Sequence, residues 1–330
     1  MRTQKIVLSG TQPSGELHIG NYLGSLKNWV EIQDKYECLF FIADYHSLSE
    51  NYNPKEKKTQ IMDLTIAYLS AGLDPKKCAI FLQSDVPQCT ELAWIFNCIT
   101  PVAYLERMTQ YKDKAIKQEQ NINMALLDYP VLQAADILMY NADYVPVGND
   151  QDQHIELTRK IAHFFNVRFG NTFKEPSGLH SSAPRIMSLT DPAKKMSKSD
   201  AIGSYISLTD SPDEIRNKIK RATTDTGKKE NNEEISGGKN LLSLLYNVSK
   251  DKDQVKKFTS EHQNGSLKYS ELKPFLSEEI IKVISPIQKR KKELEKNLDY
   301  VEKVLQAGAE KTRPIAEKTI KIVKEKIGLN

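Results

Sequence analysis

Short apolar runs alternate with longer helical stretches through the first half of the chain, and this alternation limits the possible folds more than any other feature. The runs lie at residues 5–9, 38–43, 79–82 and 144–148. Strands separated by helices pair in parallel, because each right-handed crossover returns the chain to the same end of the sheet. The pattern therefore predicts an α/β fold, with a doubly wound parallel sheet and helices on both of its faces.

Ligands of such open sheets bind beyond the carboxyl ends of the strands. Three segments follow predicted strands: the loop after Ser9, the segment 44–46 and the turn 148–150. We expect these three segments to face one crevice.

After residue 200 the pattern changes to helices alone, interrupted by the polar stretch 226–239. At 330 residues the chain exceeds one typical domain of roughly 100–200 residues, so we expect two. The expected limits are 1–200 for the sheet domain and 201–305 for a helical domain. A C-terminal amphipathic helix, at 306–330, is expected to pack back on the sheet domain.

The charge is distributed unevenly along the chain. The net charge is only +4, yet residues 287–330 hold 12 Lys and Arg against 7 Asp and Glu. A polyanionic partner would therefore meet the C-terminal part. Charge alone also fits a lysine-rich helix surface that faces only solvent.

The sequence shows no signal for export or for a membrane. The N-terminus enters a strand-like run directly, and no stretch approaches the roughly 18 apolar residues of a membrane span. The four cysteines form no C-x-x-C pair, so we expect free thiols and no protein metal site. These features predict a cytoplasmic protein. The cysteines are Cys38, Cys78, Cys89 and Cys98.

The first motif is Gln-Pro-Ser-Gly-Glu-Leu-His-Ile-Gly-Asn at residues 12–21, between the first strand and the first long helix. Glycine and small residues let backbone N–H groups approach a phosphate, and a helix N-terminus adds partial positive charge. His18 and Asn21, one turn apart, can both point at a phosphate or ribose. Alone, such a segment is often only a turn.

The second motif is Lys-Met-Ser-Lys-Ser at residues 195–199, after a strand-like run at 185–189. Two lysines and two hydroxyls on a loop suit the charge of a leaving pyrophosphate. A given five-residue string arises by chance roughly once in a million starts. The alternative, an exposed linker, requires that the first motif is also a coincidence.

Together the two motifs resemble the HIGH and KMSKS signatures of class I aminoacyl-tRNA synthetases. The blocks 9–15, 129–138 and 145–151, with 105–110 and 308–311, resemble bacterial tryptophanyl-tRNA synthetases. The resemblance implies a Rossmann-like catalytic domain of the HUP type and a helical anticodon-binding domain. It also implies ATP, Mg²⁺, L-tryptophan and tRNA(Trp) as ligands, and a homodimer.

The resemblance also implies the residues that handle ATP. The expected catalytic residues are His18, Asn21, Lys195 and Lys198, because an ionised carboxylate needs positioning and charge stabilisation rather than a general base. The two lysines would stabilise the departing pyrophosphate together with Mg²⁺. The expected ATP-binding residues are Gln12, Pro13, Ser14, Gly20, Asn21, Gly148, Asn149, Asp150, Ile186, Lys195, Met196, Ser197, Lys198 and Ser199.

For tryptophan, the resemblance assigns Asp136 as the acceptor of the indole N–H. Tyr129, Gln133 and Asp136 fall on one helix face, and a carboxylate among apolar neighbours needs a donor. An Asp paired with a nearby Arg or Lys is the alternative. The further residues expected in this pocket are Gly10, Gln12, His46, Val145, Val147 and Gln151; for His46, a satisfied core histidine is equally open.

Two residues depart from the family pattern. Leu8 stands where an aromatic residue is often found, and Gln133 stands where some relatives have methionine. The first change concerns a detail of the indole pocket. Neither change removes a charged group that the reaction needs.

Three other functions compete with this one. A tyrosyl-tRNA synthetase would share the fold, both signatures and a Gln-x-x-Asp pair. A non-catalytic tRNA-binding relative should have lost its lysines, and another nucleotidylyl transferase would bind no tRNA. The apolar group Trp94, Ile95, Phe96, Ile99 and Tyr104 is by default core, although the resemblance implies a dimer surface there.

Overall fold

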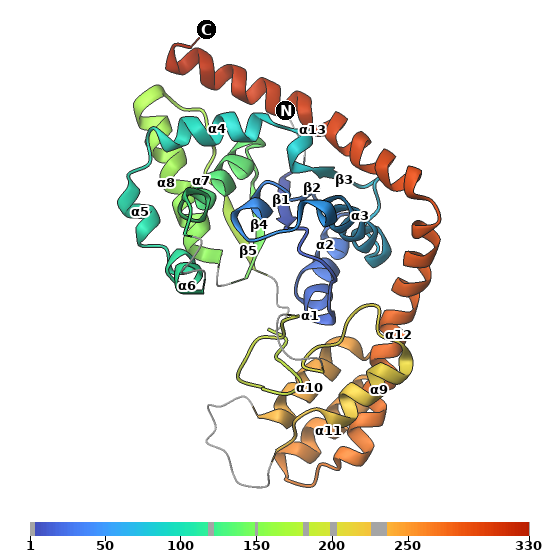
Figure 1. Cartoon of the computed structure of the whole chain (residues 1–330). Helices are drawn as coiled ribbons and strands as arrows, with labels where there is room; N and C mark the ends of the chain where they lie inside the picture. The colour runs from blue at the N-terminus through green and yellow to red at the C-terminus, as the bar shows by residue number, and fades with distance from the viewer. Residues whose placement is uncertain are drawn as a thin grey trace.

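The computed structural model describes residues 4–117, 122–148, 151–180, 185–198, 203–225 and 236–329. A part built around a sheet lies above a part built from helices (Figure 1). No helix within these ranges combines the length and the apolar character needed to cross a bilayer.

A five-stranded sheet in the order β3-β2-β1-β4-β5 forms the centre of the first part. All pairings are parallel, which confirms the predicted fold class. The strand order reverses at β1, and ligands of such sheets bind at this switch point. The strands are β1 (Ile6–Thr11), β2 (Glu37–Ile42), β3 (Cys78–Leu82), β4 (Tyr144–Val147) and β5 (Ser177–His180).

Helices cover both faces of the sheet. Neighbouring residues of a strand point to opposite faces, so each strand contributes to an apolar cluster on either side. Leu8 packs in an apolar cluster with the helices at 88–97, 124–139 and 152–169, whereas Val7 packs with those at 27–32 and 54–71 on the other face. The helices of this part are α1 (Ile19–Asn21), α2 (Lys27–Ile32), α3 (Pro54–Ala71), α4 (Gln88–Asn97), α5 (Val102–Glu106), α6 (Thr109–Lys117), α7 (Met124–Met139) and α8 (Asp152–Phe169).

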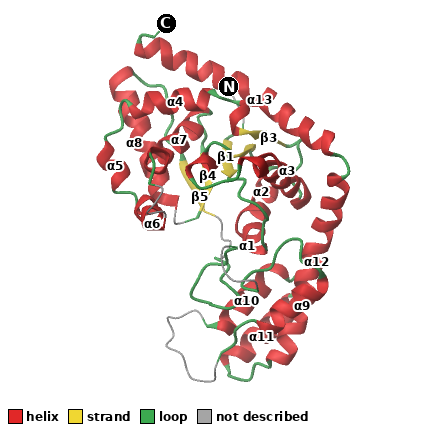
Figure 2. Cartoon of the chain, in the orientation of Figure 1, coloured by secondary structure: helices red, strands yellow, loops and turns green. Residues whose placement is uncertain are grey.

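The second part consists of helices and loops over the described residues (Figure 2). Its apolar cluster also takes in Ile186 and Met196, so the segment with the second motif packs on the helices rather than on the sheet. The expected strand at 185–189 was wrong, because only an isolated bridge joins Met187 to Lys195. The helices are α9 (Pro212–Arg221), α10 (Gly237–Val248), α11 (Lys252–Gln263) and α12 (Tyr269–Glu295).

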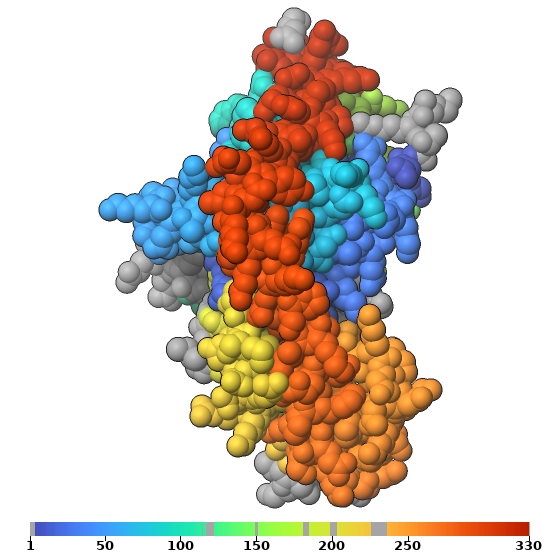
Figure 3. Space-filling model, turned by 90° about the vertical axis from the view of Figure 1, so that its right-hand side faces the viewer, coloured from blue at the N-terminus to red at the C-terminus, as the bar shows by residue number. Residues whose placement is uncertain are grey.

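The last helix, α13 (Leu298–Ile327), runs without a break through the limit expected at 305/306. It lies against β3, α4 and α7 and forms an orange-to-red band along one side of the molecule (Figure 3). Gly308 permits this contact, since a Cβ atom there would lie 1.9 Å from the carbonyl oxygen of Ile80.

Candidate active site

A cavity of about 350 Å³ opens at the carboxyl ends of β1 and β4, beside α7. Every residue expected to contact tryptophan lines this cavity, from strands, loops and helices that are distant in sequence. Its lining residues are Leu8, Ser9, Gly10, Thr11, Gln12, Phe41, Ala43, His46, Gln110, Tyr129, Gln133, Asp136, Ile137, Val145, Pro146, Val147 and Gln151.

Gly10 and Phe41 shape one wall of the cavity. They face each other in the β1–β2 register, and a Cβ atom at Gly10 would lie 2.6 Å from the Phe41 ring. Only glycine therefore lets β1 pass so close to the ring. Leu8 is buried beside it, so an aliphatic side chain occupies this part of the wall.

Asp136 lies at the inner end of the cavity with a fractional exposure of only 4%. His46 Nε2 is 2.9 Å from its Oδ2 atom, and Gln83 Nε2 donates to Oδ1 and Oδ2 at 3.0 and 2.9 Å. Its side-chain partners are thus a histidine, a glutamine and the thiol of Cys89, instead of the Arg or Lys of the alternative interpretation. A carboxylate offers about four acceptor positions, so an N–H from a ligand would share Oδ1 or Oδ2 with these partners.

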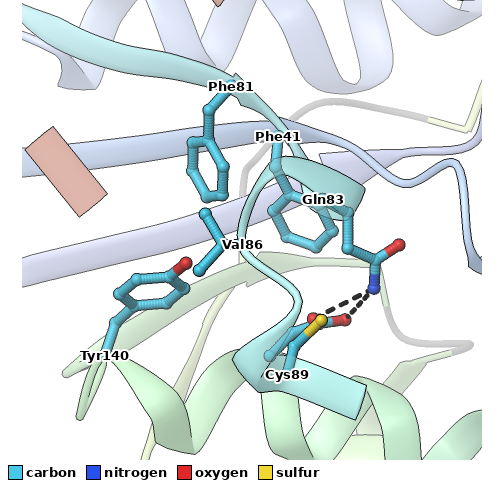
Figure 4. A pocket seen from close by; sticks show the side chains of 7 residues that line it. Phe41, Phe81, Gln83, Val86, Cys89 and Tyr140 are labelled. Carbon is cyan, nitrogen blue, oxygen red and sulfur yellow. Dashed lines mark hydrogen bonds between the residues drawn. The ribbon is translucent and has the colours of Figure 1, made fainter. Parts of the chain in front are cut away.

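Gln83 is a site residue that the sequence analysis missed. It begins the short turn η3 (Gln83–Asp85), directly after the carboxyl end of β3. Its Oε1 atom accepts the N–H of Tyr45 at 3.1 Å, which turns its amide nitrogen toward Asp136 (Figure 4). Its place after a predicted strand was the only signal in the sequence.

His154 was missed as well. It is buried on α8, and its Nε2 atom is 2.9 Å from the hydroxyl of Tyr129. This hydrogen bond orients a cavity-lining tyrosine from behind. His46, by contrast, both lines the cavity and is hydrogen-bonded in the core, so the two interpretations of this residue hold together.

The first motif forms a tight helix start. The Nδ1 atom of His18 accepts the N–H of Gly20 at 3.1 Å, and the His18 N–H donates to Asn21 Oδ1 at 3.0 Å. His18 Nδ1 and Asn21 Oδ1 thus accept hydrogen bonds from backbone N–H groups. A ligand can therefore be contacted by His18 through Nε2–H and by Asn21 through its amide N–H. Ser14 N–H donates to the carbonyl of Gln12, and Pro13 is buried in the same turn.

The second motif lies against the first. Met196 is buried and its N–H donates to the carbonyl of Ile186 at 3.0 Å, which anchors the segment. A Cβ atom at Gly15 would lie 3.0 Å from Lys198 Nζ. Burial, assisted by Lys195 and Lys198, lowers the pKa of His18 to about 4, so this imidazole is neutral at pH 7.

Further expected ATP-binding residues are Lys198, Gly148 and Ser197. Burial also lowers the pKa of Lys198, while Glu16 and Glu50 act in the opposite direction. Gly148 is exposed after β4, and Ser197 lies between the two lysines. Asn149, Asp150 and Ser199 lie outside the described residues.

Residues 2–285 match the family model of the class I tRNA synthetases for tryptophan and tyrosine. The chain belongs to this family. The tryptophan–tRNA ligase of Clostridium tetani is 45% identical over 329 residues, which cover 98% of this chain and 96% of that protein. The one from Rickettsia felis is 46% identical over 333 residues, with 98% and 99% covered.

Solved structures of the family agree with this membership. The tryptophanyl-tRNA synthetase of Campylobacter jejuni, complexed with ADP and tryptophan, is similar with a TM-score of 0.83 and 33% identity, covering 98% of this chain and all of that one. The Mycoplasma pneumoniae enzyme gives a TM-score of 0.88 at 33% identity, with 99% of both chains covered. A tyrosyl-tRNA synthetase of Archaeoglobus fulgidus, at 22% identity, shares the fold.

Proposed function

We propose that this chain is a tryptophan–tRNA ligase. It activates L-tryptophan with ATP to tryptophanyl-adenylate and pyrophosphate, and then transfers tryptophan to the 3′ end of tRNA(Trp). The observation that carries the proposal is the buried carboxylate of Asp136, which His46 and Gln83 contact at one end of a cavity with both apolar and polar walls. Relatives that cover nearly the whole chain bear the same activity in their names.

Asp136 selects the amino acid. Its carboxylate accepts the indole N–H, and Phe41, Val145 and Val147 supply apolar walls for the rings. A phenylalanine in the same place leaves the carboxylate one donor short, and sites built on such a bond reject the analogue by roughly 10⁴-fold. Tyr129 and Gln133, from the same helix, face the α-amino group of the substrate.

The adenylation step follows from charge and position. Tryptophan's carboxylate, ionised at pH 7, attacks the α-phosphorus of ATP, and the α–β bridging oxygen leaves with pyrophosphate. Lys195 and Lys198 neutralise the leaving group, and neutral His18 donates a hydrogen bond from Nε2–H.

Mg²⁺ would add further positive charge at the phosphates. No group of three His, Cys, Asp or Glu in the described ranges lies together as a metal site. Mg²⁺ is commonly held by substrate phosphates with few protein ligands. We therefore propose that it enters with ATP, while the residues of both motifs hold the nucleotide.

The helical part and the basic C-terminal segment are proposed to bind tRNA(Trp). Residues 287–330 carry the surplus of positive charge, and they belong to α12 and α13, which join the helical part to the sheet part. Contacts to phosphates release counterions, so the affinity should fall steeply with salt. An enzyme that supplies ribosomes works in the cytoplasm, which stays the expected compartment.

A homodimer is proposed on the face formed by α4 and α5. Of the predicted apolar group, Ile95 and Phe96 are core, but Trp94 is 70% exposed. Val102 on α5, which was not part of that group, is 56% exposed. We expect Trp94→Asp to shift the mass in light scattering from two chains to one. Tyr246→Asp, which changes an exposed aromatic residue on α10, should leave the dimer intact; equal masses in both variants would refute this interface.

The first test is amino-acid-dependent ATP–pyrophosphate exchange with tryptophan, tyrosine and phenylalanine in parallel. Stimulation by tryptophan alone, weakened in Asp136→Ala and Lys195→Ala, supports adenylate formation with these roles. Stimulation by tyrosine would overturn the substrate, and no stimulation at all would place the chain among non-catalytic tRNA-binding relatives. Charging of tRNA(Trp) then tests the second step.

A further inference from the structure

The helix α13 reaches the residues that stand behind the Asp136 carboxylate. It lies directly on β3 at Gly308, and it also contacts the turn η3 and the helices α4 and α7. One turn beyond Gly308, Thr312 and Arg313 come level with the segment that follows β3. The C-terminal helix therefore contacts the elements that carry Gln83 and Asp136, without lining the amino-acid pocket itself.

Arg313 holds the turn that carries Gln83. Its Nη2 and Nε atoms donate to the carbonyl oxygen of Asp85 at 3.0 and 3.3 Å. Asp85 ends the turn that Gln83 begins, and the Gln83 amide donates to both oxygens of Asp136. The Arg313 guanidinium is thus bonded to the chain only two positions after Gln83, whose amide orients the carboxylate.

The wall behind Asp136 is closely packed. A second cavity of only about 10 Å³, roughly one water molecule, lies between Gln83, Cys89 and Tyr140 (Figure 4). Burial raises the pKa of Tyr140, and a side-chain hydrogen bond with Thr312 acts in the opposite direction. With so little free space, a shift of the turn would be transmitted to the carboxylate.

The end of α7 is tied to the same helix. Thr319 Oγ1 donates to the carbonyl oxygen of Met139 at 2.7 Å, three residues beyond Asp136. The backbone that carries the carboxylate and the turn that orients it are therefore both attached to α13. Of these attachments, the one through Arg313 leads to a direct hydrogen-bond partner of Asp136.

We propose that Arg313 is a positioning residue for tryptophan recognition, which through the Gln83–Asp85 turn holds the Asp136 carboxylate where the indole N–H meets it. The inference rests on the proposed function, because it takes tryptophan as the ligand of the large cavity. Arg313 does not line that cavity. Its effect is therefore expected on the recognition of the N–H and not on ATP.

The test uses full-length Arg313→Met and Arg313→Lys in ATP–pyrophosphate exchange. Each is assayed with tryptophan and with 3-benzothienylalanine, in which sulfur replaces the indole N–H. In Arg313→Met we expect the ratio of kcat/KM between the two substrates to fall about fivefold, the loss of one typical hydrogen bond. KM for ATP should stay unchanged, and Arg313→Lys should recover part of the ratio.

Lys311→Met is the matched control. Lys311 lies on the same helix and donates to the carbonyl oxygen of Pro75 at 3.2 Å, on the segment before β3. Lys311→Met should lower kcat/KM for both substrates by the same factor, or leave both values unchanged. A ratio in Arg313→Met equal to that in Lys311→Met would overturn the proposal.

Two further measurements keep the outcome decisive. If Arg313→Met does not fold, as judged by thermal unfolding, the ratio in Arg313→Lys decides in the same way. In a double-mutant cycle with Gln83→Met, the two changes should be non-additive, since they act on one chain of contacts; full additivity would contradict the proposal. Wild-type enzyme without tryptophan-dependent exchange would instead refute the proposed function itself.

Discussion

At the scale of single residues, recognition depends on a carboxylate whose orientation other side chains fix. Both ends of the Gln83 amide are hydrogen-bonded, because Oε1 accepts the Tyr45 N–H and Nε2 donates to Asp136. We expect Gln83→Met to raise KM for tryptophan in pyrophosphate exchange about tenfold or more, because its hydrogen bonds to a charged group are lost. KM for ATP should change little.

Gln33→Met controls for the loss of any buried glutamine. Gln33 is 6% exposed and donates to the carbonyls of Val30 and Gly72, away from the cavity. It should lower the midpoint of urea unfolding without changing KM for tryptophan. If both variants change KM alike, Gln83 has no special role.

His18 makes stability depend on pH. Its pKa is about 4 in the folded chain, through burial and then Lys195 and Lys198, against 6.5 for an ordinary histidine. Between pH 6.5 and pH 4 the unfolded chain binds a proton at this histidine more readily than the folded chain. The contribution of His18 to the free energy of unfolding is therefore fully present above pH 6.5 and is lost as the pH falls toward 4. It amounts to at most about 3 kcal/mol.

The measurement compares urea unfolding of wild type and His18→Gln at pH 7 and pH 4.5. Wild type should lose more stability than the variant over this interval. An equal loss in both proteins would show that His18 titrates as it does in the unfolded chain. Activity does not enter this comparison, because His18 belongs to the proposed ATP site.

At the scale of elements, the contact between α13 and β3 leaves no room at Gly308. An added Cβ atom meets the Ile80 carbonyl oxygen, a backbone atom that cannot turn aside. We expect Gly308→Ala to lower the free energy of unfolding by about 2–4 kcal/mol in urea titrations. Gly24→Ala, where nothing lies within 4 Å of the added atom, should be nearly neutral; a similar loss at both glycines would contradict this account.

At the scale of the whole molecule, the basic segment is expected to govern the salt dependence of tRNA binding. Lys289, Lys292 and Lys296 are exposed at the end of α12. Changing all three to Gln should weaken tRNA(Trp) binding and lower the slope of log K against log salt, by about 1 for each lysine that contacts a phosphate. Tryptophan-dependent exchange, which uses no tRNA, should not change.

Lys55→Gln combined with Lys58→Gln removes exposed charge from α3 instead. This variant should keep the wild-type slope. A reduction of the slope in both variants would mean that tRNA affinity depends on the net charge of the protein and not on the position of these lysines. A reduction in the α3 variant alone would move the proposed tRNA surface away from the C-terminal segment.

Local patterns in the sequence determined much of this protein. Alternating runs predicted four of the five strands, and helical spacing placed Tyr129, Gln133 and Asp136 on one face. Both motifs also follow local rules, in which small residues free the backbone and lysines supply charge. These features depend on neighbours within a few residues, so they can be read before the chain folds.

Tertiary structure decided the rest. The short strand β5 lacks an apolar run, and it is a strand only because β4 lies beside it. Gln83 and His154 became site residues through bonds to Asp136 and Tyr129, 53 and 25 positions away. The position of α13 depends on its contact with β3, which only a glycine at 308 permits. Hydrogen bonds and packing act on distances in space, and sequence spacing does not encode those distances until the sheet brings the segments together.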